Sequence, residues 1–368
     1  MKKKLLLAFL IILSLCLLDI HNLIAQSDTS LPDLIPYSKG DKWGFCLPAQ
    51  AGEKDKKIVI TCKYDYIELF CNGMAMIKLN VKYGFIDKEG NEVIPLKYDK
   101  VWSFSKEFAG IKLNNKCGFI EKEGNEVIPL KYDQTQYFIE GLARIKLNGK
   151  YGYIDKDGKE VIPIKYDDAS NFSEGLAAVK LNNKDGFIDK EGKEIIPFKY
   201  DWTEEFSEGL AAVNINNKNG FVNKEGKEII PLKYEYVWKF SEGLAAVALN
   251  QKWGFVDKEG KEVIPLKYDN AYPFYEGHAA VELNGKYGFI GKDGKKIIPL
   301  IYDAAMIFGE GLTAVKLNGK YGFINKEGKE VISFKYEDAG VFYKGLAWVE
   351  LNNKWGYIDK NGNEYWEE

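Results

Sequence analysis

Arginine is almost absent from this sequence. Arg144 is the only arginine, and lysine supplies every other strongly basic side chain. Two-point recognition of phosphate depends on the planar guanidinium fork. A net charge of −3 also provides no positive field that would concentrate DNA or RNA. These two features argue against nucleic acid as a partner.

Histidine is equally scarce, with His21 in an apolar N-terminal stretch and His278 far downstream. A Ser-His-Asp or Cys-His arrangement would depend on His278 alone, and zinc sites with histidine ligands are excluded by count. The sequence also has no Cys-x-x-Cys pair and no phosphate-binding glycine loop followed by Lys-Ser/Thr. We therefore expect a protein that is not an enzyme, with no catalytic residue, no metal site and no cofactor.

The sequence has only five cysteines. Cys16 lies in the N-terminal stretch, and Cys46, Cys62, Cys71 and Cys117 follow it. Export would permit disulfides, but four cysteines allow three pairings and the sequence gives no basis for choosing among them.

The first residues resemble a targeting signal. A basic start, Met1 to Lys4, precedes an apolar run from Leu5 to Leu18, and cleavage after Ala25 is expected. We therefore predict a signal peptide over 1–25, a linker over 26–32, and export to the periplasm, the cell surface or the medium. An uncleaved membrane anchor is one alternative, although fourteen residues are short for a span. Lipidation of Cys16 is the other, and a link to a membrane is expected only through the signal segment or this lipid anchor.

Beyond residue 32 the chain is a tandem repeat with a period of 34 residues. Ten units cover 33–368. The first is irregular, with an insertion near 48–57, and the last is truncated. Each unit centres on one residue followed by glycine, at Trp43-Gly44, Tyr83-Gly84, Cys117-Gly118, Tyr151-Gly152, Asp185-Gly186, Asn219-Gly220, Trp253-Gly254, Tyr287-Gly288, Tyr321-Gly322 and Trp355-Gly356.

The local pattern of each unit predicts strands. Helical repeats of the same period are excluded because turn glycines and an Ile-Pro segment recur in the units. In one unit we expect strands over 175–181, 184–189 and 194–201, joined by a tight turn at Asn182-Asn183. Each unit is thus predicted to be a three-stranded antiparallel meander, and the chain to be all-β.

Both faces of this meander are apolar, so each must be covered by a neighbouring unit. Ala178 and Ile196 should lie opposite Phe187 and share its face with Phe198, while the other face carries Ala177 and its neighbours. Units stacked face to face form either an open superhelix or a closed, propeller-like ring. We favour the superhelix, because ten units exceed the usual ring and no spare strand completes the first unit.

The repeated motif resembles that of the bacterial WG-repeat (KWG-repeat) proteins. It reads Lys-Trp/Tyr-Gly-Phe-Ile-Asp-Lys-x-Gly-Lys-Glu-Val-Ile-Pro-x-x-Tyr-Asp, followed by Phe-Ser-Glu-Gly-Leu-Ala, and it covers nearly all of the chain beyond residue 32. Cys117, Asp185 and Asn219 depart from it, because they replace the ring at the name-giving position. The resemblance implies little about activity, since the family is defined by its repeat.

Aspartates recur once per unit at two positions, represented by Asp189 and Asp201. A catalytic pair would break the repetition at one place, whereas these residues follow it. We interpret them as turn caps, with calcium binding as the alternative.

Four residues after each Tyr-Asp vary between units, and a constant scaffold that presents a variable row is typical of binding repeats. Within this variable row we single out five aromatic side chains as binding candidates: Trp102, Tyr137, Trp202, Trp238 and Tyr272. The alternative is that they cover apolar surface between units. We expect a non-catalytic scaffold that binds a protein partner, with carbohydrate or cell-wall binding as the alternative function.

Overall fold

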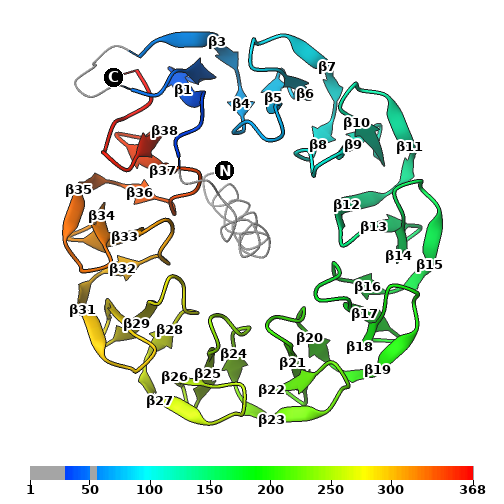
Figure 1. The fold of residues 1–368 in the computed structure, drawn as a ribbon, viewed down its shortest axis with the longest axis vertical. Coiled ribbons are helices and arrows are strands. Elements are labelled where there is room, and N and C mark those ends of the chain that lie inside the picture. Colours follow the sequence, from blue (N-terminus) through cyan, green and yellow to red (C-terminus); the bar gives the residue numbers. More distant parts are fainter. Residues whose placement is uncertain (1–29, 50–55, 368) are drawn as a thin grey trace.

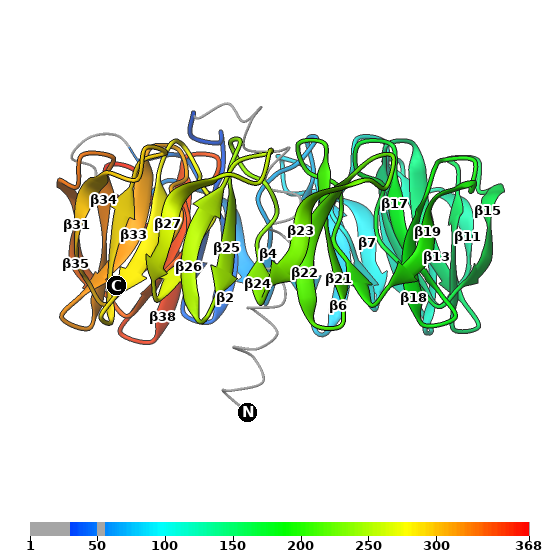
Figure 2. The same cartoon turned by 90° about the horizontal axis from the view of Figure 1, so that it is seen from below.

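The computed structural model describes residues 30–49 and 56–367, which form ten small β-sheets arranged in a closed ring (Figure 1). Seen from the side, the ring is a flat disc (Figure 2). The predicted signal segment with Cys16, and most of the predicted linker, lie outside the described residues. Within residues 30–49 and 56–367 there is no helix long and apolar enough to cross a membrane. The prediction of an all-β tandem repeat is confirmed.

Each sheet has its strands in chain order from the inside of the ring to the outside (Figure 1). The innermost strands are β4 (Tyr66–Ile67), β8 (Lys100–Val101), β12 (Gln134–Ile139), β16 (Asp168–Ala169), β20 (Trp202–Thr203), β24 (Tyr236–Val237), β28 (Asn270–Ala271), β32 (Ala304–Ala305) and β36 (Asp338–Ala339). The second strands are β1 (Ile35–Lys39), β5 (Ala75–Leu79), β9 (Phe108–Leu113), β13 (Leu142–Leu147), β17 (Ala177–Leu181), β21 (Leu210–Ile215), β25 (Ala245–Leu249), β29 (Ala279–Leu283), β33 (Leu312–Leu317) and β37 (Leu346–Leu351).

The third strands are β2 (Lys42–Cys46), β6 (Lys82–Ile86), β10 (Lys116–Glu121), β14 (Lys150–Ile154), β18 (Lys184–Ile188), β22 (Lys218–Asn223), β26 (Lys252–Val256), β30 (Lys286–Ile290), β34 (Lys320–Asn325) and β38 (Lys354–Asp359). The outer strands are β3 (Ile58–Tyr64), β7 (Glu92–Tyr98), β11 (Glu126–Tyr132), β15 (Glu160–Tyr166), β19 (Glu194–Tyr200), β23 (Glu228–Tyr234), β27 (Glu262–Tyr268), β31 (Lys296–Tyr302) and β35 (Glu330–Tyr336).

The predicted hairpin register is found in sheet β16–β19. Ala178 and Ile196 both lie opposite Phe187, and the turn residues Asn182 and Asn183 have φ angles of 54° and 60°. Positive φ at both positions is what a two-residue hairpin turn of this hand requires. The structure adds a short fourth strand, β16, which pairs with β17 on the inner side of the ring.

A bulge in the outer strand explains the invariable glycine of the motif. Gly186 alone faces the segment between Ile196 and Tyr200, because Phe187 pairs with Ile196 and Asp185 pairs with Tyr200. A Cβ on Gly186 would lie 2.6 Å from the carbonyl oxygen of Ile196, so no larger residue fits there.

The same bulge corrects one predicted face. Phe198 was expected beside Phe187, but it packs on the other side of its sheet, against Tyr166 of the preceding sheet with ring centroids 6.3 Å apart. The expectation was wrong because the extra residues of a bulge interrupt the strict alternation of side chains between the two faces.

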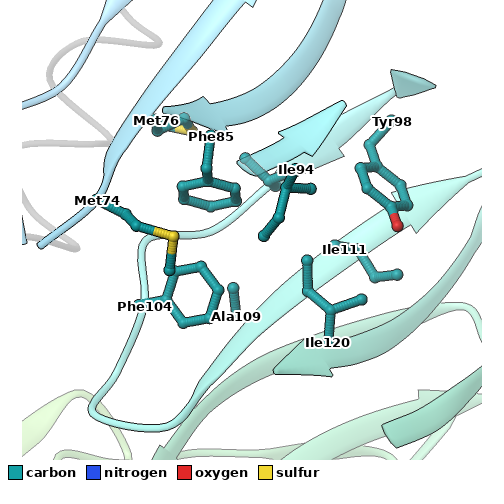
Figure 3. Packing of buried hydrophobic residues seen from close by; sticks show 10 residues of the cluster. Met74, Met76, Phe85, Ile94, Tyr98, Phe104, Ala109, Ile111 and Ile120 are labelled. Atoms are coloured by element: carbon teal, nitrogen blue, oxygen red, sulfur yellow. The ribbon is translucent and has the colours of Figure 1, made fainter. Parts of the chain in front are cut away.

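The core is divided among the interfaces between consecutive sheets. Figure 3 shows one of them, where Phe85 and Ile94 of one sheet meet Phe104, Ile111 and other residues of the next. The ring of Phe85 meets the ring of Phe104 edge to face at 4.9 Å, a geometry that aromatic pairs favour. The same edge-to-face contact recurs around the ring at Phe187–Phe206, Phe221–Phe240, Phe255–Phe274, Phe289–Phe308 and Phe323–Phe342. Phe119 and Phe138 meet at the equivalent place with tilted rings.

One end of the ring carries the asparagine turns, and we call it the Asn-turn end. Asp99, between β7 and β8, accepts the backbone N–H of Asn114 at 2.8 Å and pairs with Lys82 at 2.6 Å. The lysine holds the pKa of Asp99 below its usual range. Because Lys82 and Asn114 belong to neighbouring sheets, each such aspartate links two sheets, and its predicted role as a turn cap is confirmed.

The opposite end carries a second set of links. Glu174 accepts the backbone N–H of Gly209 at 3.1 Å and pairs with Lys224 at 3.1 Å. Equivalent pairs join Glu140 to Lys190, Glu208 to Lys258, Glu242 to Lys292, Glu276 to Lys326 and Glu310 to Lys360. Exposed pairs contribute little individually, but each of these pairs joins one sheet to the next.

Residues 364–367 close the ring. Glu364 forms an antiparallel bridge with Ile358 of β38, and Trp366 forms a parallel bridge with Ser38 of β1. Between them Tyr365 is fully buried in a cluster that contains Ile35 of β1 and Leu346 of β37. The arrangement is therefore the ring given as the alternative and not the favoured superhelix. The argument that no strand was available for the first sheet was wrong, because Trp366 bridges to Ser38 of β1 in a parallel orientation, whereas the strands of the repeat pair antiparallel.

Candidate functional site

The variable row lies on the inner rim of the ring, because its first two residues form the innermost strands (Figure 1). Its second residue is usually buried, as at Val101, Thr135, Ala169, Thr203 and Ala271. The first and third residues point to the other side of the short strand. Exposed aromatic side chains of the row therefore come from these two positions.

Trp238 and Tyr272 form one exposed contact between neighbouring sheets, which we call the Trp238–Tyr272 stack. Their ring centroids lie 6.5 Å apart with an interplanar angle of 29°. Trp238 is 41% exposed, whereas Tyr272 is half-buried and contacts Tyr287 of its own sheet. Both residues occupy the third place of the row, so equivalent positions of consecutive sheets bring the rings together.

The other predicted binding residues differ in their surroundings. Trp102 is half-buried, packs against the core between two sheets, and lies so close to Gly110 that an added Cβ there would be 2.9 Å from its ring. Tyr137 is half-buried in β12, the longest of the inner strands. Trp202 is 43% exposed in β20. Trp102 thus covers apolar surface, while Trp202 and Trp238 present their rings to solvent.

Two adjoining open hollows lie near Trp202 at the Asn-turn end, with volumes of about 360 and 560 Å³. We call them together the Asn219 hollow. Its lining consists of Trp202, Asn214, Asn217, Asn219, Glu235, Tyr236, Val237 and Gln251, from sheets β20–β23 and β24–β27. The hollow therefore spans one interface between sheets.

The hollow lies where the aromatic side chain of the repeated motif is replaced by a small one. In sheet β24–β27, Tyr236 stacks on Trp253 with ring centroids 6.2 Å apart. In sheet β20–β23 the residue in the place of Trp253 is Asn219, which is buried and donates to the backbone oxygen of Glu235 at 2.9 Å. The side chain of Asn214 donates to Asn219 at 2.9 Å. A small amide pair thus replaces a large ring, and space remains beside Trp202.

The links of the Asn-turn end are also interrupted here. Glu235 stands where other units have the linking aspartate, and within the described part of the chain it forms no ion pair. The longer side chain of glutamate does not explain the missing ion pair, because Glu337 at the same repeat position pairs with Lys320 at 2.6 Å. Glu235 accepts only the backbone N–H of Gln251, at 3.0 Å. One carboxylate at the hollow is therefore left without a cation.

A carboxyl group within the variable row, that of Glu204, has a shifted pKa. Burial raises the pKa of Glu204 to about 7, against an opposing effect of Lys239 and a reinforcing effect of Glu205. Glu204 takes the same place in its sheet as Trp238 takes in the next. It can therefore change its charge near neutral pH.

The scarce histidine and cysteine residues have structural surroundings. His278 lies within hydrogen-bonding distance of the backbone oxygens of Glu276 and Lys326 and packs on Phe308 with ring centroids 4.6 Å apart. Cys46, Cys62, Cys71 and Cys117 are free thiols, and burial raises the pKa of Cys46 to about 12. In the described ranges no three His, Cys, Asp or Glu side chains gather in a way that could hold a metal ion.

A comparison with known protein families identifies the repeat. The profile described as "WG containing repeat" matches nine consecutive segments, 53–83, 83–117, 118–151, 151–184, 186–218, 220–253, 253–287, 287–321 and 321–355. The chain belongs to the WG-repeat family. The resemblance read from the motif is thereby confirmed.

No curated protein sequence matches this WG-repeat chain. Among solved structures it is similar to a eukaryotic initiation factor, with 12% identity, a TM-score of 0.55, and coverage of 90% of this chain and 99% of that one. It is also similar to the extracellular domain of a one-component system from B. thetaiotaomicron, with 10% identity, a TM-score of 0.33, and coverage of 91% and 57%. The first similarity concerns the fold alone, and nothing about this chain is concluded from the second.

Sequence reasoning singled out Trp202 but missed the polar lining of its hollow. Asn214, Asn217, Asn219, Glu235 and Gln251 lie apart along the WG-repeat chain, and only the packing of two sheets brings them together. Two signals were available: the loss of the ring at Asn219 and the change from aspartate to Glu235. Both are departures from the repeat, and they coincide at one interface.

Proposed function

We propose that this WG-repeat protein is a non-catalytic binding scaffold that acts outside the cytoplasm and contacts a protein partner through the Trp238–Tyr272 stack. Export follows from the predicted signal segment. The absence of catalysis is inferred from the repeating polar residues, because the aspartates and glutamates that recur act as turn caps and links between sheets. The binding role is inferred from the inner rim.

The observation that carries this proposal is the exposure of Trp238. The Trp238 ring is 41% exposed, and it stacks on the ring of Tyr272 from the next sheet. Trp and Tyr are the residues most enriched where a few side chains dominate protein–protein binding. Lys239 follows Trp238 directly in the row and supplies a charged group beside the stack. A rigid aromatic anchor with a polar edge suits a protein surface.

Capture of partners from the cell envelope of the source organism tests this proposal. Wild-type protein is compared with Trp238→Ala, Tyr272→Ala and, as a matched control, Trp355→Ala, which removes a tryptophan that is 39% exposed in the last sheet. We expect one partner that binds wild-type protein and Trp355→Ala equally, and that binds the two stack variants at least tenfold more weakly by titration.

Melting temperatures of the same variants separate binding from packing. If Trp238→Ala and Tyr272→Ala lowered the melting temperature and left partner binding unchanged, the stack would be a cover between sheets and the proposal would be wrong. Carbohydrate binding, the alternative function, is supported by a different surface, the Asn219 hollow.

A further inference from the structure

The Asn219 hollow combines aromatic faces with amide side chains. Trp202 is 43% exposed and Tyr236 is 64% exposed, so both rings lie open to solvent at the border of the hollow. Stacking on Trp253 fixes the plane of the Tyr236 ring. Flat apolar faces of this kind receive the C–H face of a sugar ring or the face of another planar ligand.

The polar lining narrows the choice of ligand. Four amide side chains, those of Asn214, Asn217, Asn219 and Gln251, line the hollow together with the Glu235 carboxylate. An amide offers a donor and an acceptor at once, which is what a ligand rich in hydroxyl groups needs. No Lys or Arg side chain is in this lining, and the unpaired Glu235 repels anions. Phosphorylated or acidic ligands are therefore disfavoured.

The hydrogen-bonding capacity of the lining is only partly used within the protein. Asn219 is saturated by Asn214 and by the backbone oxygens of Tyr234 and Glu235. Asn217 and Gln251, by contrast, are exposed at neighbouring hairpin turns, and their side chains form no hydrogen bond to the described residues. The amides of Asn214 and Asn219 are thus engaged with each other, whereas the two turn amides and Glu235 remain available to a ligand.

We infer that the Asn219 hollow is a binding subsite for a neutral sugar unit of a glycan. One ring of the glycan lies against Trp202 or Tyr236, and its hydroxyl groups bond to Asn217, Gln251 and Glu235. The two parts of the hollow, about 360 and 560 Å³, each lie within the range of small-molecule pockets, which suits a short stretch of sugar units and not a folded domain. This surface is separate from the Trp238–Tyr272 stack, so the inference does not depend on a protein partner.

The test uses purified protein and three neutral oligosaccharides, chitotriose, cellotriose and maltotriose, at millimolar concentrations. Binding is followed by tryptophan fluorescence and by calorimetry. We expect at least one of the three to bind, with affinity at least tenfold lower in Trp202→Ala and in Asn219→Trp, and unchanged in Trp355→Ala. Asn219→Trp restores the family's own ring and fills the hollow, and its melting temperature separates loss of binding from unfolding.

Three results would overturn the inference. The first is that none of the three oligosaccharides binds. The second is that Asn219→Trp, confirmed as folded by its melting temperature, binds as tightly as wild-type protein. The third is that adenosine, a neutral planar ligand that also stacks on tryptophan, binds the hollow more tightly than every oligosaccharide. A glycan site and a site for planar bases are thereby distinguished.

Discussion

Sheets β20–β23 and β24–β27 are neighbours with nearly the same strands, yet they differ at the Asn-turn end. In β24–β27 a tryptophan, Trp253, supports Tyr236, and Lys252 pairs with Asp269 at 2.5 Å. In β20–β23 Asn219 leaves Trp202 without such a ring, and Glu235 leaves Lys218 without a partner among the described residues. The interior is unaffected, because Phe221 and Phe255 are both fully buried. The repeat therefore tolerates change at this end while its core stays constant.

The largest effect is expected where the two sheets are alike. Phe221→Ala should lower the free energy of unfolding by about 3–5 kcal/mol, because the Phe221 ring is fully buried and meets Phe240 at 5.0 Å. Phe255→Ala, in the regular sheet, should cost about the same. Denaturant unfolding of both variants measures this. A clearly smaller loss for Phe221→Ala would mean that the hollow has already weakened the core of its sheet.

The third place of the variable row gives the next comparison, Glu204 in one sheet against Trp238 in the other. The pKa of Glu204 is raised from 4.5 to about 7 by burial. The folded protein therefore holds this proton more tightly than the unfolded chain, so stability falls as pH rises from about 4.5 to 7. Glu204→Gln should remove that part of the pH dependence. Unfolding curves at several pH values would contradict this if wild-type protein and variant changed in parallel.

Making the two sheets alike should have a moderate effect. Asn219→Trp places a ring beside Trp202, as Trp253 lies beside Tyr236 in the neighbouring sheet. We expect a gain of about 0.5–1.5 kcal/mol from the aromatic pair, seen as a higher melting temperature and a changed Trp202 fluorescence. A lower melting temperature would show that the hydrogen bonds of Asn219 to the backbone outweigh the ring.

The smallest effect concerns the links at the Asn-turn end. Lys252→Ala removes an exposed ion pair with Asp269 and should lower the melting temperature only slightly, because exposed pairs contribute little to stability. Lys218→Ala removes no such pair and should leave the melting temperature unchanged. If both substitutions lowered the melting temperature equally, the missing ion pair at Glu235 would make no difference to stability.

The strands were predictable from sequence because their determinants are local. Asn182 and Asn183 favour positive φ, alternating residues such as Ala178 and Phe187 mark paired strands, and both features recur in most units. The face of Phe198 was not predictable in the same way. Its orientation depends on the bulge opposite Gly186, which the alternation of apolar residues does not reveal.

The candidate site was predicted only in part. Exposed Trp202 and Trp238 belong to the variable row, and this row was recognised because it departs from a constant background. Trp102 belongs to the same row but is half-buried over Gly110, and only the packing distinguishes the two cases. The role of the aromatic residues in binding stays a prediction.

The sequence by itself determined the repeat, its period, its strands and the apolar faces that force the units to stack, because each of these depends on residues close together in the chain. Tertiary structure alone decided that the stack closes into a ring, since closure depends on Trp366 bridging Ser38 at the far end of the chain. It also decided that Asn219, Glu235 and Trp202 share one hollow, because the sequence shows each departure from the repeat but only the packing of two sheets brings these residues together.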